Sequence, residues 1–482
     1  MSTPIEPGPA TVRFAQRQTR GLILGLSALR AAALATAIAT FVVALVLGGM
    51  IGAAASTPLA ASLVVMAIAR WNGSPAIDAL PVVAEWSARA AMGQTRYRRR
   101  IATPRPAGTM ALPGDAAPLR FVCDPVTGAA MVHDPHRSTI AATLTVQHPA
   151  YALLAPDDRA GRVTGWSRAL AGLAAAGNIA AIQILEATVP DPGHEMRRWW
   201  SKHGVGDGGW AAAQYEELMA EAVGSSTHRT TLTIAVDLRR AAREVRDAGR
   251  GIVGAAAVLR TAMTSFESSV RASGLGVAGW LAPSELASVV RHAYDPDANQ
   301  TSRSPGADLA ASGPVAIDEH WDHLRHDSGV SSVLWLSEWP RIEVPPHFLH
   351  ALVFTPGVRR TLSIVARPLG SAEALRQIRR EKVEYVTDAE QKARLGQLAD
   401  LADEQQYADV LTRERALISG HADLTFTGLV VVTAPTPDEL ASARAAVERA
   451  AVQCGCETRL LYGQQAAAFV AAALPLGRGV HR

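Results

Sequence analysis

An uncharged apolar run covers residues 31–69 and is the clearest feature of the hydrophobic pattern. A single helix of that length would be about twice as long as the roughly 30 Å hydrocarbon core of a bilayer is thick. Residues that favour a turn gather near its middle: Gly48, Gly49, Gly52, Ser56 and Pro58. The pattern therefore predicts a transmembrane hairpin of two helices, over about 31–51 and 53–69.

Two other structures could give an apolar run near the start of a chain. A cleaved signal peptide would be cut near the small residues at 53–55, but the run is longer than the apolar part of a signal peptide. The core hairpin of a soluble protein would be polar on one face, whereas these residues are apolar on every face of a helix. We therefore interpret the run as membrane-spanning.

Arginines flank the run on both sides, and the turn between the two predicted helices carries no charge. Positively charged residues close to a span stay on the cytoplasmic side of the membrane. We therefore expect a multi-pass protein of the cell membrane with both termini in the cytoplasm, and with Trp71 as an anchor at the lipid interface. The membrane-flanking arginines that predict this topology are Arg13, Arg17, Arg20, Arg30, Arg70, Arg98, Arg99 and Arg100.

Beyond residue 118 the pattern changes to short alternating apolar segments, which turns or helical periodicity separate. This order predicts an α+β fold of split βαβ, ferredoxin-like units with long helices. One helix start is well marked, because Thr436 can cap the helix while Pro437 and Glu439 occupy its first turn. The predicted strands are 120–123, 130–132, 139–147, 179–187, 230–238, 330–336, 360–365, 423–432 and 458–462.

Shifts in composition divide the chain into seven predicted parts. The clearest internal boundary is a stretch rich in Ser, Gly, Pro and Asp between two halves of similar size. The parts are a basic cytoplasmic N-terminal segment (1–29), a two-helix transmembrane hairpin (30–71), a juxtamembrane helix and linker (72–118), a first α+β half (119–298), a linker (299–313), a second α+β half (314–477) and a tail (478–482).

The net charge of +3 hides an uneven distribution. The first hundred residues hold ten arginines against three acidic residues, so the remainder of the chain is net negative. The basic charge therefore belongs to the membrane flanks, where it can meet anionic lipid. A surface for nucleic acid needs a basic soluble domain, so no direct binding of nucleic acid is expected.

Several kinds of catalytic site are excluded by their missing motifs. The three lysines are Lys202, Lys382 and Lys392, and none completes a phosphate-binding loop. G-x-G-x-x-G occurs at Gly204, Gly249 and Gly274, but no predicted strand directly precedes any of them. The three cysteines lack zinc-ligand spacing, and neither H-E-x-x-H nor G-x-S-x-G occurs. We therefore predict a protein that is not an enzyme, with no catalytic, cofactor-binding or metal site.

One polar segment, 318–327, concentrates acids and histidines. Its histidines, His320, His323 and His326, recur every three residues, which would spread them around a helix. We interpret the segment as a solvated stretch before the strand at 330. A membrane-tethered metal-dependent hydrolase that uses His320 and His323 stays as the weaker alternative.

The first hundred residues resemble the PrgI family of conjugation membrane proteins. The matching features are the basic lead-in at 13–20, Gly25-Leu26-Ser27 ahead of Arg30, the short hairpin and the exit at 93–100. The rest resembles the N-terminal, non-motor domain of type IV secretion ATPases of the TraC/TrbE/CagE class. There the match lies in the βαβ halves, the helix start at 436–440, and the ending at 464–469 followed by Ala-Leu-Pro-Leu-Gly at 473–477.

This resemblance implies a non-enzymatic, membrane-anchored structural component of a conjugative or type IV secretion machine, which docks a separate ATPase to the membrane channel. In the ATPase family this ending comes shortly before the motor domain, and the phosphate-binding lysine is missing here. The implied partners are the secretion ATPase, other membrane channel subunits and the lipid bilayer, in an oligomeric assembly. A type VII secretion membrane component, with two N-terminal spans and a cytoplasmic domain, is the main alternative.

Overall fold

The computed structural model describes residues 28–100, 108–147, 153–190, 194–204, 208–221, 226–297, 308–394 and 401–479, together with Val12 and Phe14. Several predicted features lie outside these described residues. They are Arg13, Arg17 and Arg20, nearly all of the basic N-terminal segment, most of the linker at 299–313, and the last residues of the tail.

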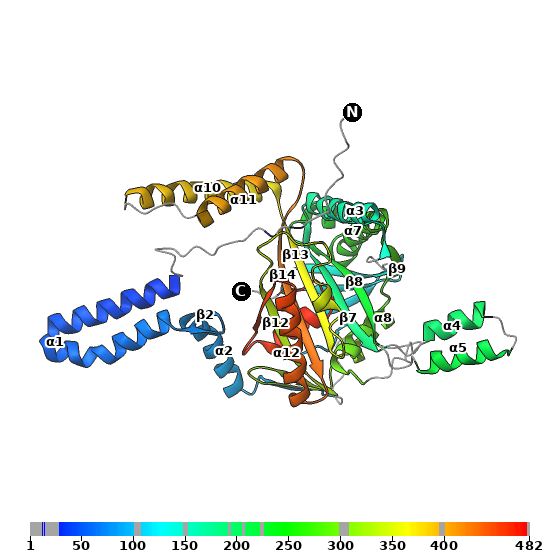
Figure 1. Ribbon diagram of the computed structural model, residues 1–482, viewed down its shortest axis with the longest axis horizontal. Helices are drawn as coiled ribbons and strands as arrows, with labels where there is room; N and C mark the ends of the chain where they lie inside the picture. Colours follow the sequence, from blue (N-terminus) through cyan, green and yellow to red (C-terminus); the bar gives the residue numbers. More distant parts are fainter. Residues whose placement is uncertain are drawn as a thin grey trace.

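An antiparallel sheet forms the centre of the protein, and within the described residues it holds 13 strands (Figure 1). The α+β class predicted from the sequence is confirmed. The order across the sheet is β3 (Arg96–Arg98), β10 (Ala316–Glu319), β11 (Leu324–His326), β12 (Gly329–Glu338), β14 (Asp423–Ala434), β13 (Arg359–Leu369), β7 (Ile179–Pro190), β8 (Ser226–Asp237), β6 (Thr139–Gln147), β5 (Ala130–Asp134) and β4 (Arg120–Cys123). In addition, β15 (Glu457–Leu460) pairs with β12, and β9 (Gly276–Trp280) pairs with β6.

The two halves share this one sheet, so the prediction of separate ferredoxin-like units is wrong. β7 of the first half pairs with β13 of the second half, from Ala187 opposite Thr361 to Ile182 opposite Ala366. An unpaired edge on either strand would expose a row of backbone donors and acceptors, and the pairing of the two edges removes that cost. We call this β7–β13 pairing the seam.

Each half repeats the same order of elements along the chain. In the first half β6, α3 (Pro156–Ala175), β7, β8, α7 (Gly251–Ala272) and β9 follow one another. In the second half the order is β12, α9 (His350–Val353), β13, β14, α12 (Pro437–Gln453) and β15. A helical pair is inserted at the same point of each half, and Figure 1 shows both pairs projecting from the sheet. These pairs are α4 (His194–His203) with α5 (Trp210–Glu221), and α10 (Ser371–Arg394) with α11 (Leu401–Ile418).

Helices cover both faces of the sheet, and the alternation of side chains along each strand explains how. In β14, Val430 and Val432 join the core under α9 and α12, whereas Leu429 and Val431 point to the other face. In the first half α3 and α7 pack on the face that α9 and α12 cover in the second half. The opposite face is covered by α8 (Pro283–Tyr294) and α13 (Gln465–Ala473).

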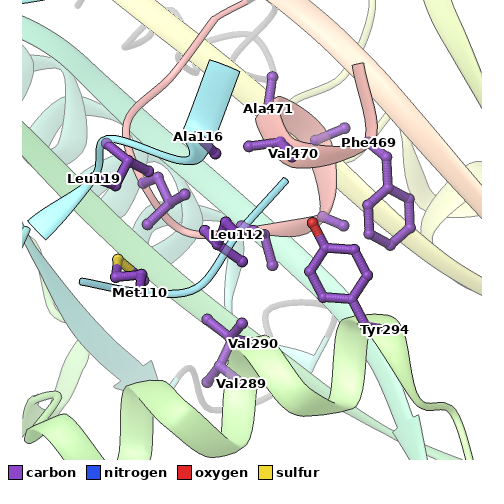
Figure 2. Close-up of a cluster of buried hydrophobic side chains, with 14 of the residues drawn as sticks. Met110, Leu112, Ala116, Leu119, Val289, Val290, Tyr294, Phe469, Val470 and Ala471 are labelled. Carbon is purple, nitrogen blue, oxygen red and sulfur yellow. The ribbon is translucent and has the colours of Figure 1, made fainter. Parts of the chain in front are cut away.

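The core on that opposite face joins segments that lie far apart in the sequence. Its side chains come from α8, from α13 and from residues 110–119, which precede β4 (Figure 2). Residues 108–118 were predicted as part of a linker, yet this stretch contributes buried side chains and the short helix η2 (Gly114–Ala116). The labelled members are Met110, Leu112, Ala116, Leu119, Val289, Val290, Tyr294, Phe469, Val470 and Ala471.

The apolar run forms a single helical element, α1 (Ala28–Ile68), in which Gly49 alone has non-helical backbone angles. One candidate membrane span, Leu29–Ile68, is long and apolar enough to cross a bilayer, a property that a signal sequence shares. The prediction of a hairpin of two separate helices is therefore corrected to one element, because helical structure resumes directly after Gly49 and no loop divides it.

The path of α1 is nevertheless not straight. The Nε of Arg30 donates to the carbonyl oxygen of Ala67 at 3.0 Å, whereas a straight helix of 41 residues would hold its ends about 60 Å apart. Near the middle, a Cβ atom on Gly52 would lie only 2.3 Å from the carbonyl oxygen of Ala44. The element therefore turns back on itself at Gly49, as Figure 1 shows.

Short elements connect α1 to the sheet. They are β1 (Arg70–Trp71), β2 (Ser74–Pro75), the short helix η1 (Ala76–Ala79), α2 (Leu80–Ala91) and then β3. The juxtamembrane helix predicted within 72–118 is α2. The remaining short helices are α6 (Ala242–Asp247) and η4 (Leu309–Ala311).

Candidate functional site at the membrane-proximal junction

The junction between α1 and the sheet is the candidate site, since it joins the apolar element to the rest of the protein. We define the junction as β1, β2, α2 and β3 together with the residues of β10, β11, β15 and α13 that they contact. β1 and β2 form a two-stranded turn around Asn72, whose side-chain amide donates to the carbonyl oxygen of Leu460 at 3.0 Å. This hydrogen bond holds the turn against the end of β15.

Four aromatic rings fill the junction. Trp71 lies 4.8 Å from Tyr462 and 6.1 Å from Trp321, measured between ring centroids. Trp86 of α2 meets Trp321 edge-on at 5.1 Å. Such contacts are worth about 0.5–1.5 kcal/mol each beyond the buried area. The sequence marked Trp71 as an anchor at the lipid interface, but its ring packs on the protein and is 41% exposed.

A buried ion pair fastens α2 to the sheet. The Nη1 of Arg89 lies 2.6 Å from the Oε2 of Glu319, and the Glu319 side chain is only 2% exposed. The Nη2 of Arg89 donates to the carbonyl oxygen of Gly463. The other oxygen of Glu319 accepts a hydrogen bond from the backbone N–H of Ala466, in the first turn of α13, at 3.0 Å. One carboxylate thus joins the juxtamembrane helix to the C-terminal helix, whose N-terminal dipole favours negative charge.

β3 adds a strand to the sheet edge directly after α2. Tyr97 lies opposite Ile317 and Arg98 opposite Ala316 in the pairing of β3 with β10. The Nη2 of Arg98 contacts the Oδ2 of Asp318 at 2.9 Å, and this hydrogen bond holds the pKa of the Asp318 carboxyl below its usual value. The chain therefore leaves the membrane side as an ordered edge strand of the main sheet.

The described arginines that flank the apolar run fall into two groups, those that bond to the rest of the protein and those that are exposed. Arg30 bonds to Ala67 within α1, Arg98 pairs with Asp318, and the Nη1 of Arg99 donates to the carbonyl oxygen of Ala311 at 2.8 Å. Arg70 and Arg100 are exposed. Arg98 and Arg99 thus serve the fold of the domain. Sequence reasoning missed Arg89 and Glu319, for which the spacing of residues gives no signal because they are distant in the chain.

The polar segment 318–327 is a β-hairpin, β10 and β11, and the expectation of a solvated stretch is wrong for part of it. The ring of His326 is buried, and its nitrogens contact the carbonyl oxygen of Tyr294 at 2.7 Å and the hydroxyl of Ser331 at 2.8 Å. His320 and His323 stack at 4.4 Å with nearly parallel rings. Among the described residues, no group of three or more His, Cys, Asp or Glu is placed to hold a metal ion.

The other chemical candidates lie in ordinary structural positions. Gly274 precedes strand β9 and Gly276 is its first residue, whereas a dinucleotide motif follows a strand. Gly455, between the two cysteines, has φ +70°, the left-handed angle that glycine adopts at a helix end. Cys454 and Cys456 are buried, and burial raises the pKa of the Cys456 thiol to about 12, so it stays protonated.

Comparison with protein-family models and with curated proteins found no match to this chain. The geometry of the junction is thus the basis on which its function is inferred.

Proposed function

We propose that this chain is a non-enzymatic, membrane-anchored structural component of a conjugative or type IV secretion machine, and that it docks a separate ATPase to the membrane channel. The observation that carries the proposal is the junction, where the buried Arg89–Glu319 pair ties the membrane-proximal helix both to the sheet edge and to α13. A flexible tether would serve to localise an enzyme. A rigid attachment suits a part that holds one large assembly against another.

The finer part of the proposal is that α1 crosses the membrane twice. The halves on either side of Gly49 are each about 20 residues long, enough for one crossing. Val12, which precedes α1, exchanges two backbone hydrogen bonds with Val344, which follows it, at 2.8 and 3.0 Å. Because these residues touch, the chain before and after α1 lies on one side of the bilayer. The flanking arginines make that side the cytoplasm.

The internal repeat also supports the proposed kinship. The sheet order β7–β8–β6–β9 in the first half matches β13–β14–β12–β15 in the second, so the two halves repeat one arrangement of strands. A chain of two halves is one of the features on which the resemblance to the non-motor domain of secretion ATPases rests. The ATPase itself, the channel subunits and the bilayer are the proposed partners, in an oligomeric assembly.

The geometry of the histidines favours this scaffold over a metal-dependent hydrolase. A metal site needs ring nitrogens that converge on one point. His320 and His323 are stacked face to face, and the Nδ1 of His323 lies 2.7 Å from the carboxylate of Asp322. The rings of His320 and His323 therefore contact each other and Asp322, and their nitrogens do not converge on one point.

The test of the proposed function is purification of the tagged full-length protein from its native membrane in mild detergent, followed by mass spectrometry. We expect a conjugation-type ATPase as the leading partner, absent from an untagged control. A type VII secretion ATPase in its place would assign the chain to that machine. A preparation with bound metal and no ATPase would favour the hydrolase and contradict the scaffold.

The double crossing predicts a distinct pattern of labelling. Cys123 is exposed in the domain, so it provides an internal marker for the cytoplasmic side. In a Gly48→Cys variant, an impermeant maleimide should label residue 48 in intact cells, and Cys123 only after the membrane is opened. Labelling of Cys123 in intact cells would contradict the topology.

A further inference from the structure

A small cationic pocket lies where the seam reaches one end of the sheet. It has a volume of about 30 Å³, and its walls come from both halves of the protein. The strands β7 and β8 supply Arg229 and its neighbours, while β13 and β14 supply Arg359, Thr361 and Thr433. α8 and α13 close it with His292 and Phe469. Figure 2 shows Phe469 beside Tyr294, where the two helices meet.

Arg229 has no partner for its charge in the described part of the chain. Its Nε is shielded from solvent and makes no hydrogen bond. Burial, and after it the neighbouring Arg359, lower the pKa of Arg229 to about 10, so it remains charged at pH 7. The residue as a whole is half-buried, and a charge that is partly withdrawn from water without a counter-charge is costly.

Arg359 does not relieve this imbalance, because it is itself a cation. Two of its donors bond to the carbonyl oxygens of Pro296 and His292, each at 2.9 Å. Those oxygens are neutral acceptors, and the acidic groups that act on Arg359, Asp297 first and then Asp295, do not line the pocket. The described residues that line the pocket include no carboxylate. The nearby Asp295 is engaged outside the pocket, by Arg291 at 2.6 Å and by the hydroxyl of Ser328.

The size of the pocket limits what could neutralise it. A cavity needs about 10–15 Å³ on this measure to hold one water molecule. The pocket therefore has room for the oxygen atoms of a single oxyanion group. Guanidinium groups match the oxygens of phosphate in a bidentate manner, and threonine hydroxyls add donors. Thr361 stands in the wall for this role, beside Thr433, whose hydroxyl also contacts that of Ser331 at 2.8 Å.

We propose that the pocket at the seam binds one phosphate group, with Arg229 as its principal ligand. The phosphate belongs either to a small soluble molecule or to a lipid headgroup with a terminal phosphate. Because both halves contribute to the walls, the bound anion would hold the two halves together at this end of the seam. The proposal stands apart from the scaffold function and does not depend on it.

The test compares the full-length protein in detergent with Arg229→Met, which removes the charge and keeps most of the volume. The probe is inorganic phosphate, titrated against chloride at constant ionic strength. We expect phosphate to raise the unfolding midpoint of the native protein and to bind at least tenfold more weakly to Arg229→Met. Arg243→Met is the matched control, because Arg243 is 89% exposed on α6, and it should respond to phosphate as the native protein does.

A second readout separates a ligand arginine from a structural one. Without phosphate, Arg229→Met should unfold at the same temperature as the native protein or a higher one, because it removes a half-buried charge that has no counter-charge. A clearly lower midpoint would overturn the proposal, since it would mean that Arg229 already has a partner that stabilises the fold.

The source of the phosphate is distinguished with nanodiscs that contain phosphatidic acid or only phosphatidylcholine. Stabilisation by inorganic phosphate assigns a soluble ligand, and stabilisation by phosphatidic acid alone assigns a lipid headgroup. In either case Arg229→Met must abolish the effect. Absence of both effects, or an unchanged response in Arg229→Met, would overturn the proposal.

Discussion

At the scale of single residues, a few buried polar groups hold distant parts of the chain together. Glu319 is the clearest example, because its two oxygens face Arg89 in α2 and the first turn of α13. Neither contact could be predicted from sequence, since the partners are 230 and 147 positions away. What the sequence could predict was local: the cap at Thr436, whose hydroxyl accepts from the N–H of Glu439.

Glu319→Gln should lower the free energy of unfolding by about 2–3 kcal/mol, because the amide leaves the partly buried Arg89 with only the exposed Glu85, 4.0 Å away, as a counter-charge. Urea unfolding of the purified protein measures this. Glu338→Gln is the control: its partner Arg341 is 69% exposed, so the loss there should be below about 0.5 kcal/mol. Equal losses in the two variants would contradict a special role for Glu319.

A second buried carboxylate predicts a dependence on pH. Asp124 accepts a bidentate pair from Arg260, at 2.6 and 3.1 Å, which lowers the pKa of Asp124 to about 2. A lowered pKa stabilises the fold above the unfolded-state value, about 3.9, and the contribution disappears as the pH falls toward 2. It amounts to about 2 kcal/mol near neutral pH.

The measurement compares the native protein with Asp124→Asn in urea unfolding at pH 6 and pH 3. Their difference in stability should shrink by about half at pH 3, since the unfolded state then binds the proton while the folded state does so only in part. A difference that does not change with pH would mean that the ion pair with Arg260 does not set the pKa of Asp124.

At the scale of elements, the hydrophobic pattern predicted where strands lie along the chain, but it did not predict which strands pair. The segments at 120–123 and 139–147 are β4 and β6 with the expected bounds. The segment 318–327 was interpreted as a solvated stretch because of its acids and histidines, yet it forms a hairpin, since β3 and β12 lie on either side of it. Pairing of this kind is non-local, so no pattern within the segment records it.

The turn in α1 depends on Gly49, whose φ of +57° and ψ of −148° suit glycine alone. Gly49→Val should strain the turn by about 1–3 kcal/mol and separate the two ends of α1. Disulfide formation between Ala33→Cys and Ala67→Cys, which pack in one cluster, reports that separation in a Cys123→Ser background.

The matched control is Gly48→Val, because Gly48 has open space around it and ordinary backbone angles. That variant should cross-link like the native sequence. If Gly49→Val also cross-links fully, the turn does not require glycine.

At the scale of the whole molecule, the C-terminal segment is fixed across the seam. The side-chain amide of Gln183 donates to the carbonyl oxygens of Ala471 and Leu474, each at 3.1 Å, and to the hydroxyl of Ser363 at 2.9 Å. Its oxygen accepts from the N–H of Gly477 at 2.8 Å. The sequence suggested a boundary near 477, but Arg478 beyond it is buried against Asp134.

Gln183→Ala should therefore loosen residues 474–479 and lower stability by about 2–4 kcal/mol, since the four polar groups that Gln183 joins lose this hydrogen bond. Limited proteolysis that follows a C-terminal tag measures the release, with Gln214→Ala on the exposed face of α5 as the control. Equal rates of tag loss would show that Gln183 does not hold the segment.

The continuous sheet also links motion at one of its edges to motion at the other. β3, which follows α2, is the first of eleven strands from one edge to the other, and β4 is the last. At about 4.8 Å per strand the two edges lie roughly 50 Å apart. The Arg89–Glu319 pair fixes α2 to the first edge. If α1 spans the bilayer as proposed, a change of about 5° in the tilt of α1 and α2 would therefore move the far edge by about 4 Å. A small rotation of α1 and α2 would thus displace the far edge of the sheet by about the size of a side chain.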